Sequence, residues 1–259
     1  MTEGEWLAST DTAKMLAWRQ DLGRQSLLGV PTYTAASNRK LRLFACACCR
    51  SVWHLLTDTR SRRAVETAER FADGEDGCSH SMDREWTDAW AVVGGPETQN
   101  LRTNERMPAR ACGWLTSTHP NVEMCNLVVK DTVGDLVAAA LLRSIVGNPF
   151  APVTLDDTWL TTTVVSLAEA AYQERAVDVC KSCWGNGWHI IDNDEKCKCR
   201  SCNGEGVIQT GQFNPDRLGI LADAIEDAGC TNATIIEHLR GPDPHYRGDW
   251  CIDLLTGRN

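Results

Sequence analysis

Two copies of one cysteine and glycine pattern, C-x-x-C-x-G-x-G, constrain this chain more than any other feature. The first copy occupies residues 180–187 and the second residues 199–206. Two residues between paired cysteines allow both sulfurs to meet one ion, and the spacing between the pairs is that of a four-cysteine zinc site. The sequence therefore predicts one structural Zn²⁺ with no coordination position left for hydrolytic chemistry. Its expected ligands are Cys180, Cys183, Cys199 and Cys202.

The glycines of both copies indicate sharp turns after each second cysteine, where backbone N–H groups face the thiolates and a Cβ atom is unfavourable. Two nearby side chains are alternative ligands. Cys197 lies just before Cys199, and His189 follows the first copy. The repeated pattern favours Cys199 and Cys202, and a site containing His189 would leave one cysteine of a complete pair without the ion.

Two tryptophans, Trp184 and Trp188, lie in or beside the first copy. A module of this size has almost no core to hide them, and indole rings are enriched at interaction hot spots. The sequence leaves two interpretations open. Either Trp184, Trp188 and His189 contact a protein partner, or the indoles pack the module against the rest of the chain.

Residues 180–206 resemble half of the cysteine-rich zinc domain of DnaJ-type co-chaperones. That domain carries four such units and binds two zinc ions, whereas this chain has two units. The resemblance implies a single zinc ion, a β-hairpin-like module of about 30 residues, and a partner surface at most half the size of the family's.

The other cysteines are expected to be reduced, as buried small residues or reactive thiols. The chain begins without the basic and apolar segments of a secretory signal, which favours a cytoplasmic location. The total of 13 cysteines is odd, so metal ligands and buried thiols are better accounts than a disulfide framework, although a secreted disulfide-linked protein is the alternative. Cys46, Cys48 and Cys49 point in different directions on a helix, so we expect them to be small buried residues.

Helical periodicity dominates the rest of the chain and predicts a mainly α fold. The clearest apolar stripe follows a helix cap at Ser37 and comprises Leu41, Phe44, Ala45, Cys48, Val52, Leu55 and Leu56. Further helices are expected at residues 60–72, 83–93, 106–118, 122–146, 162–176, 214–228, 231–239 and 250–255, with Asn214 and Thr231 as the caps of the helices at 214–228 and 231–239. In the helix at 122–146, the predicted core face comprises Val133, Leu136, Val137, Ala140, Leu141 and Ile145.

Because strong helical patterns lie on both sides of the cysteine cluster, we expect the cluster to interrupt a helical domain. The predicted organisation is a helical body at residues 1–178, a zinc-binding insertion at 179–212, and C-terminal helices at 213–259 that pack back on the body. The two ends of the insertion should then lie close together, because its ligands stabilise it internally and it costs the host little more than loop closure.

The net charge of −9 disfavours non-specific binding to a phosphate backbone. One segment is locally basic, and it supports an alternative function as a nucleic-acid-associated zinc protein. Its residues are Arg39, Lys40, Arg42, Arg60, Arg62 and Arg63. The other interpretation is a helix face whose cations pair with acids elsewhere in the fold.

Residues 39–50, 61–66, 221–224 and 241–245 resemble a paralogous bacterial family of unassigned function, which implies a shared helical fold and no particular mechanism. The common catalytic motifs are missing, so an enzyme would need a dispersed site. The remaining histidines show no spacing for a shared ion and are expected to be capping or surface residues; they are His54, His80, His119, His238 and His245. We therefore expect a non-enzymatic, zinc-stabilised protein-interaction protein with an adaptor or chaperone-like role.

Overall fold

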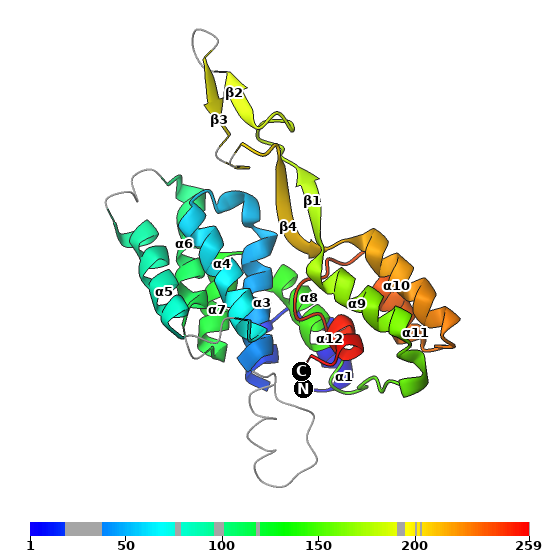
Figure 1. Ribbon diagram of the computed structural model, residues 1–259. Helices are drawn as coiled ribbons and strands as arrows, with labels where there is room; N and C mark the ends of the chain where they lie inside the picture. The colour runs from blue at the N-terminus through cyan, green and yellow to red at the C-terminus, as the bar shows by residue number, and fades with distance from the viewer. Residues whose placement is uncertain are drawn as a thin grey trace.

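A computed structural model describes residues 1–18, 38–75, 79–95, 101–117, 120–190, 195–199, 201–202 and 204–258. The protein is mainly α, as predicted, with two small antiparallel sheets that extend away from the helices (Figure 1). The predicted cap Ser37 and His119 lie outside the described residues. Within them, no helix combines the length and the apolar composition that crossing a lipid bilayer requires.

Apart from α1, which was not predicted, the helices follow the predicted order along the chain. They are α1 (Glu3–Ala8), α3 (Asn38–Ser51), α4 (Thr59–Ala72), α5 (Ser79–Gly94), α6 (Thr103–Leu115), α7 (Val122–Asp131), α8 (Gly134–Val146), α9 (Thr162–Gln173), α10 (Pro215–Asp227), α11 (Ala233–Arg240) and α12 (Trp250–Thr256), with 3₁₀ turns η1 (Trp53–Leu55) and η3 (Asp157–Trp159). The strands are β1 (Arg175–Val179), β2 (Trp188–Ile190), β3 (Lys196–Lys198) and β4 (Val207–Phe213).

Helix α3 is the centre of the first hydrophobic core, which is built mainly from α3 to α8 and also contains Trp6 of α1. Every residue from Arg42 to Arg50 is buried, so this helix is surrounded by the rest of the fold. The predicted stripe continued to Leu56, but α3 ends at Ser51 and the 3₁₀ turn η1 follows. The apolar spacing could not reveal this change, because α- and 3₁₀-helices both place residues i and i+3 on nearly the same side.

The single helix predicted at residues 122–146 is wrong, since the chain bends between α7 and α8. Gly134 has a positive φ of 71°, a conformation that residues with a Cβ atom rarely adopt. The bend rotates α8 relative to the predicted stripe. Leu136 is 69% exposed and Val137 is also exposed, whereas Ala138 and Leu142 take the core positions.

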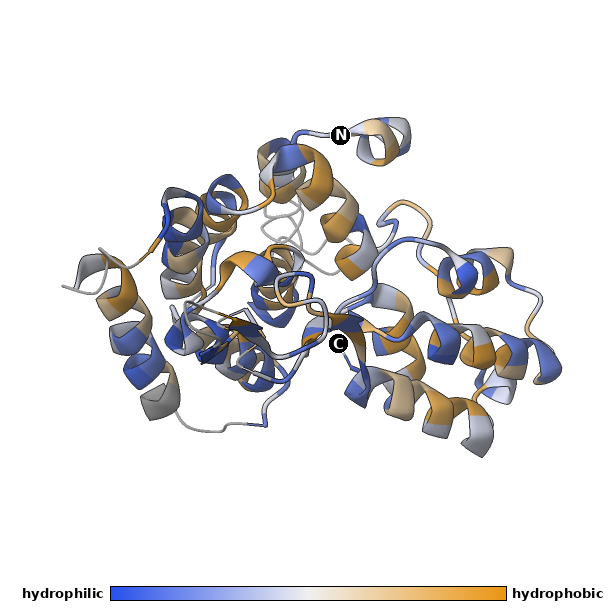
Figure 2. Ribbon diagram, turned by 90° about the horizontal axis from the view of Figure 1, so that it is seen from above, coloured by the Kyte–Doolittle hydropathy of each residue, from blue (hydrophilic) through white to orange (hydrophobic). Residues whose placement is uncertain are grey.

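A second hydrophobic core unites α9 with the three C-terminal helices. Val164 of α9 is buried with Leu221 of α10 and Ile252 of α12. Helix α9 therefore shares its core with helices that follow the insertion. Seen from above, helices of both groups carry hydrophobic stripes beside hydrophilic ones (Figure 2).

A buried ionic network joins the two cores. The Arg39 guanidinium of α3 contacts Asp73, next to the end of α4, at 2.8 Å and Asp253 of α12 at 3.0 Å. The Tyr172 hydroxyl of α9 donates to the same Asp73 carboxylate at 2.8 Å. Because each charged group has an opposite partner, the network can be buried without an unpaired charge.

The insertion is a long hairpin made of two ladders. Strand β1 pairs with β4, and β2 pairs with β3 farther from the helices. Arg175 faces Phe213 at the base of the first ladder, so the two ends of the insertion lie side by side as expected. On the inner face of this ladder, the half-buried Ile208 packs against the first hydrophobic core and against the four cysteines.

Helix caps near the insertion follow local sequence rules. Asn214 accepts a hydrogen bond from the Asp216 N–H and Pro215 occupies the first turn of α10, as predicted. The cap of α11 is Asn232, one residue after the predicted Thr231, and its side chain accepts from the Thr234 N–H. Asn and Thr are both frequent caps, so the sequence alone could not separate two neighbours.

Candidate metal centre

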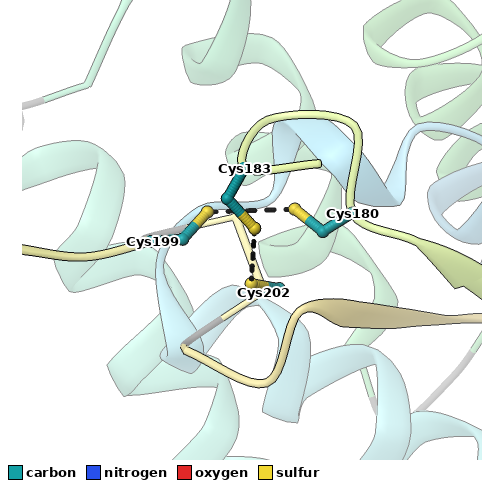
Figure 3. A group of neighbouring side chains, drawn as sticks. All are labelled: Cys180, Cys183, Cys199 and Cys202. Carbon is teal, nitrogen blue, oxygen red and sulfur yellow. Dashed lines mark hydrogen bonds between the residues drawn. The ribbon is translucent and has the colours of Figure 1, made fainter. Parts of the chain in front are cut away.

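The four predicted cysteines meet where the two ladders of the insertion join. Cys180 and Cys183 lie between β1 and β2, whereas Cys199 and Cys202 lie between β3 and β4. All four side chains are buried and their sulfurs converge (Figure 3). The Sγ atoms of Cys180 and Cys199 are 3.8 Å apart, and those of Cys183 and Cys202 are 3.6 Å apart.

These separations fit tetrahedral coordination. With a metal–sulfur bond of about 2.3 Å, tetrahedral geometry places neighbouring sulfurs about 3.8 Å apart, whereas a disulfide requires about 2.05 Å. The observed distances of 3.8 and 3.6 Å therefore suit four thiolates around one ion. The buried four-cysteine group can hold a metal ion.

The two cysteine turns form the same hydrogen bonds. The Gly187 N–H donates to the Cys183 sulfur at 3.2 Å, and the Gly206 N–H donates to the Cys202 sulfur at 3.2 Å. Such donors stabilise thiolates, the form of cysteine that binds metals. Each turn also supports the other, because the Cys180 N–H donates to the Gly206 carbonyl and the Cys199 N–H donates to the Gly187 carbonyl, both at 2.9 Å.

Glycine is required at these turns for two reasons: the two backbones approach each other closely, and φ is positive. A Cβ atom on Gly187 would lie 2.3 Å from the Gly204 carbonyl oxygen, and one on Gly206 would lie 2.2 Å from the Gly185 oxygen. Gly187 and Gly206 also have φ values of 79° and 77°. The two turns can therefore meet only where both carry glycine.

Neither alternative ligand belongs to the four-cysteine group. Cys197 is half-buried on β3, where it pairs with His189 of β2. The His189 side chain hydrogen-bonds to Cys199. Although burial opposes ionisation, bonds from the Cys202 backbone and His189 lower the pKa of Cys199 to about 5. His189 thus lies beside a sulfur that the pattern predicted as a ligand.

The two tryptophans of the insertion have different surroundings. Trp184 follows Cys183 directly, is 83% exposed, and is a non-glycine residue with a positive φ of 52°. Trp188 is half-buried, and the Lys196 Nζ lies 3.9 Å from its ring centroid. The interpretation that both indoles pack against the helical body is therefore wrong for Trp184.

The side chains of the predicted basic segment are mostly engaged inside the fold. Arg39 and Lys40 contact Asp253, Arg42 donates to the Leu115 carbonyl, Arg60 pairs with Asp58, Arg62 donates to the Leu56 and Ser201 carbonyls, and Arg63 pairs with Glu85 and Asp88. Of these six, Arg63 alone is classed as exposed. They do not form an exposed row of cations. Arg62 instead links α4 to the second cysteine turn.

Cys46, Cys48 and Cys49 are buried in the first core, as predicted. Burial raises the pKa of all three thiols well above the ordinary value. A thiol with a raised pKa carries little thiolate, so these residues act as small apolar side chains.

The prediction that His238 and His245 are unrelated surface or capping residues is wrong. Both rings contact the buried carboxylate of Asp249. Sequence reasoning missed this cluster because the three residues come from different elements. The available signal was Asp249, which stands at the cap position before the apolar run of α12.

Comparisons of the chain with models of protein families, with curated proteins and with solved structures give no match.

Proposed function

We propose that this protein is a non-enzymatic interaction protein in which one structural zinc ion fixes the shape of the insertion and the insertion contacts a protein partner. The observation that carries this proposal is Trp184, an indole that is 83% exposed directly beside the four-cysteine group. In a small module, a large apolar side chain held outward by a rigid turn is a strong candidate for a binding anchor.

Zinc is the ion that suits this ligand set best. Four thiolates in tetrahedral arrangement are typical of structural zinc sites, and they leave no open position for a substrate. The resemblance of residues 180–206 to the DnaJ-type zinc domain supports the same ion. The ion would replace the hydrophobic core that the insertion lacks, because within the described residues the apolar side chain packed against the four cysteines is the half-buried Ile208.

The proposed contact surface continues from Trp184 onto the outer face of the first ladder. Val179 and Val207 are paired across this ladder, and Val177 follows on the same face. All three are exposed. The Cγ1 atom of Val179 would lie 3.3 Å from a Cβ atom on Gly185, so this face adjoins the turn that carries Trp184. We call Trp184, Val177, Val179 and Val207 the outer face.

A protein fits this surface better than a polyanion does. The outer face consists of apolar side chains, and protein interfaces are enriched in tryptophan and depleted of charge at their centres. The net charge of −9 repels phosphate backbones. Most cations of the basic segment also contact acids or carbonyls inside the fold.

The test is a native pull-down that compares wild type, Trp184→Ala and Trp86→Ala. Trp86 lies on α5 of the helical body and is 50% exposed, so it is a matched exposed indole away from the insertion. We expect a partner that wild type and Trp86→Ala retain and that Trp184→Ala loses. Val179→Thr should weaken the same interaction, because threonine has a volume similar to that of valine but places a hydroxyl on the outer face.

An unchanged set of partners in Trp184→Ala would reject the outer face as the binding surface. Metal binding by the four cysteines is tested by a separate measurement. Cobalt bound by the four cysteines gives intense sulfur-to-metal charge-transfer absorption, which Cys180→Ser should reduce. Protein that shows these sulfurs as disulfides would reject the metal centre itself.

A further inference from the structure

A second cluster of potential metal ligands lies in the helical part of the protein, away from the four cysteines. His238 comes from α11, His245 from the segment before α12, and Asp249 from the cap position of α12. The ligand atoms of all three lie within 4.8 Å of one another. Asp249 is fully buried and His245 is 4% exposed, so the cluster is enclosed by the fold.

Helix capping accounts for one oxygen of Asp249 and leaves the other unexplained. Oδ1 accepts hydrogen bonds from the backbone N–H groups of Cys251 at 2.9 Å and Ile252 at 3.2 Å. These are the contacts that an N-cap residue makes. Oδ2 lies 2.9 Å from a nitrogen of each imidazole, and His238 Nε2 also lies 3.1 Å from Oδ1; capping requires none of these contacts.

More donors face this carboxylate than it can accept. Besides the two backbone N–H groups on Oδ1, Oδ2 is contacted by Ser144 Oγ at 3.0 Å, His238 Nε2 at 2.9 Å and His245 Nδ1 at 2.9 Å. A carboxylate offers about four lone-pair positions, and five groups converge on it. One cation shared by the imidazole nitrogens and Oδ2 would replace two N–H protons and relieve this excess.

The distances suit such an ion. Adjacent ligands bonded to a metal at about 2.0–2.1 Å lie roughly 2.9–3.4 Å apart in octahedral or tetrahedral geometry. Both imidazole nitrogens are 2.9 Å from Oδ2. Two imidazoles and one carboxylate form a ligand set that first-row transition metals prefer.

The cluster can be reached from solvent on one side. His238 and Ser144 line a pocket of about 1120 Å³ between α8, α11 and α12. The pocket provides an entry path and room for water at the remaining coordination positions. Three protein ligands with an open side are typical of sites that bind an exchangeable ligand, in contrast to the closed four-cysteine group.

We propose that His238 Nε2, His245 Nδ1 and the Asp249 carboxylate form a second metal site that takes a divalent first-row transition ion, with its open side toward the pocket. This site is independent of the zinc-binding insertion and of the proposed protein partner. Ser144 is a positioning residue, because its hydroxyl contacts the carboxylate ligand.

The experiment loads metal-free full-length protein with Co²⁺ and compares wild type with His238→Ala, Asp249→Asn and His54→Ala. Asn keeps a capping oxygen at position 249, so this variant removes the anionic ligand and preserves the cap. His54 is exposed and serves as the matched control. The circular dichroism and melting temperature of the metal-free proteins check that each variant is folded.

We expect two cobalt ions per chain in wild type and in His54→Ala, one with thiolate charge-transfer bands and one without. His238→Ala and Asp249→Asn should lose the ion that lacks those bands and retain the thiolate-bound ion. Affinity for the second ion should fall more than about 100-fold, since removing groups that merely support ligands costs about 10–100-fold. Ser144→Ala should fall within that smaller range.

Two outcomes would overturn the second site. One is a wild-type protein that binds cobalt only through thiolates. The other is retention of both ions by His238→Ala and Asp249→Asn. Both results leave the four-cysteine proposal intact, because that site is identified by its sulfur bands.

Discussion

The insertion and the helical body reach fixed structures by different physical means. In the body, α3 is buried on all sides by apolar residues from several helices. In the insertion, four sulfurs and a few backbone hydrogen bonds replace a hydrophobic core. Burial of apolar area is spread over many residues, whereas metal binding concentrates stability in four. The two regions should therefore lose their structure under different treatments.

The largest expected effect is removal of metal from the insertion. Structural zinc contributes an apparent free energy of about 10–16 kcal/mol in zinc-finger peptides. A chelator, or Cys183→Ser, should therefore remove hydrogen-exchange protection from residues 175–213 and leave α3 protected. Global unfolding in the chelator would show instead that the body depends on the insertion.

A core truncation in the body should produce the opposite pattern. Phe44 is fully buried in α3, and Phe44→Ala should lower the free energy of unfolding by about 3–5 kcal/mol. Urea denaturation followed by helical circular dichroism measures this loss. Thiolate-bound metal per folded chain should stay unchanged. A loss of metal from the folded variant would contradict separate stabilisation of the two regions.

Acid should act on a buried ion pair of the body. Arg50 contacts Glu69 through two hydrogen bonds of 2.9 and 2.8 Å. Burial opposes ionisation of Glu69, but Arg50 outweighs it and lowers the pKa of the carboxyl below 4.5. The pair therefore contributes its full stability above pH 4.5, and this contribution is lost as pH falls through the lowered pKa.

Glu69→Gln should cost about 3 kcal/mol at neutral pH, because it leaves the buried Arg50 guanidinium without its counter-charge. The variant should also lose less stability than wild type when the pH is lowered below 4.5. Urea titrations of both proteins across this range measure the difference. Parallel curves for the two proteins would contradict the assigned role of Glu69.

The smallest expected effect is that of replacing a glycine by alanine, and two glycines with similar φ values allow a comparison between the body and the insertion. Gly229 has a φ of 93° and open space around its Cα, so Gly229→Ala should cost the body about 1–2 kcal/mol. Gly187→Ala meets the same conformational cost and also a backbone oxygen at 2.3 Å. It should weaken metal binding by the insertion, measured by chelator competition, whereas Gly229→Ala should not. Equal metal affinities would contradict the close approach of the two turns.

Local signals in the sequence were sufficient for the cysteine group and for most helix boundaries. The four ligands, the glycine turns and the Asn214 cap each depend on residues that are near one another in the chain. Spacing and backbone conformation determine such features directly. This is why the insertion, which has almost no core, was predicted better than parts of the body.

Features that depend on packing between distant helices were not predictable in the same way. The buried face of α8 depends on the bend at Gly134, which rotates Leu136 and Val137 outward. The partners of Arg39 come from elements far apart in sequence. The two histidines lie within 11 positions of Asp249, but they meet its carboxylate only because α11 packs against the start of α12. Periodicity identifies a helix and its apolar side, but it does not reveal which distant side chain lies opposite.

The pairing of Val179 with Val207 at the top of the first ladder makes the insertion replaceable as a unit. Antiparallel strands in register need only a short turn to connect them, so a two-residue loop could substitute for everything between these valines. Helices α9 and α10 would keep their positions, since both belong to the second core. The same host could therefore acquire, lose or exchange such a module during evolution without rebuilding its interior, and recognition could diversify while the scaffold stayed the same.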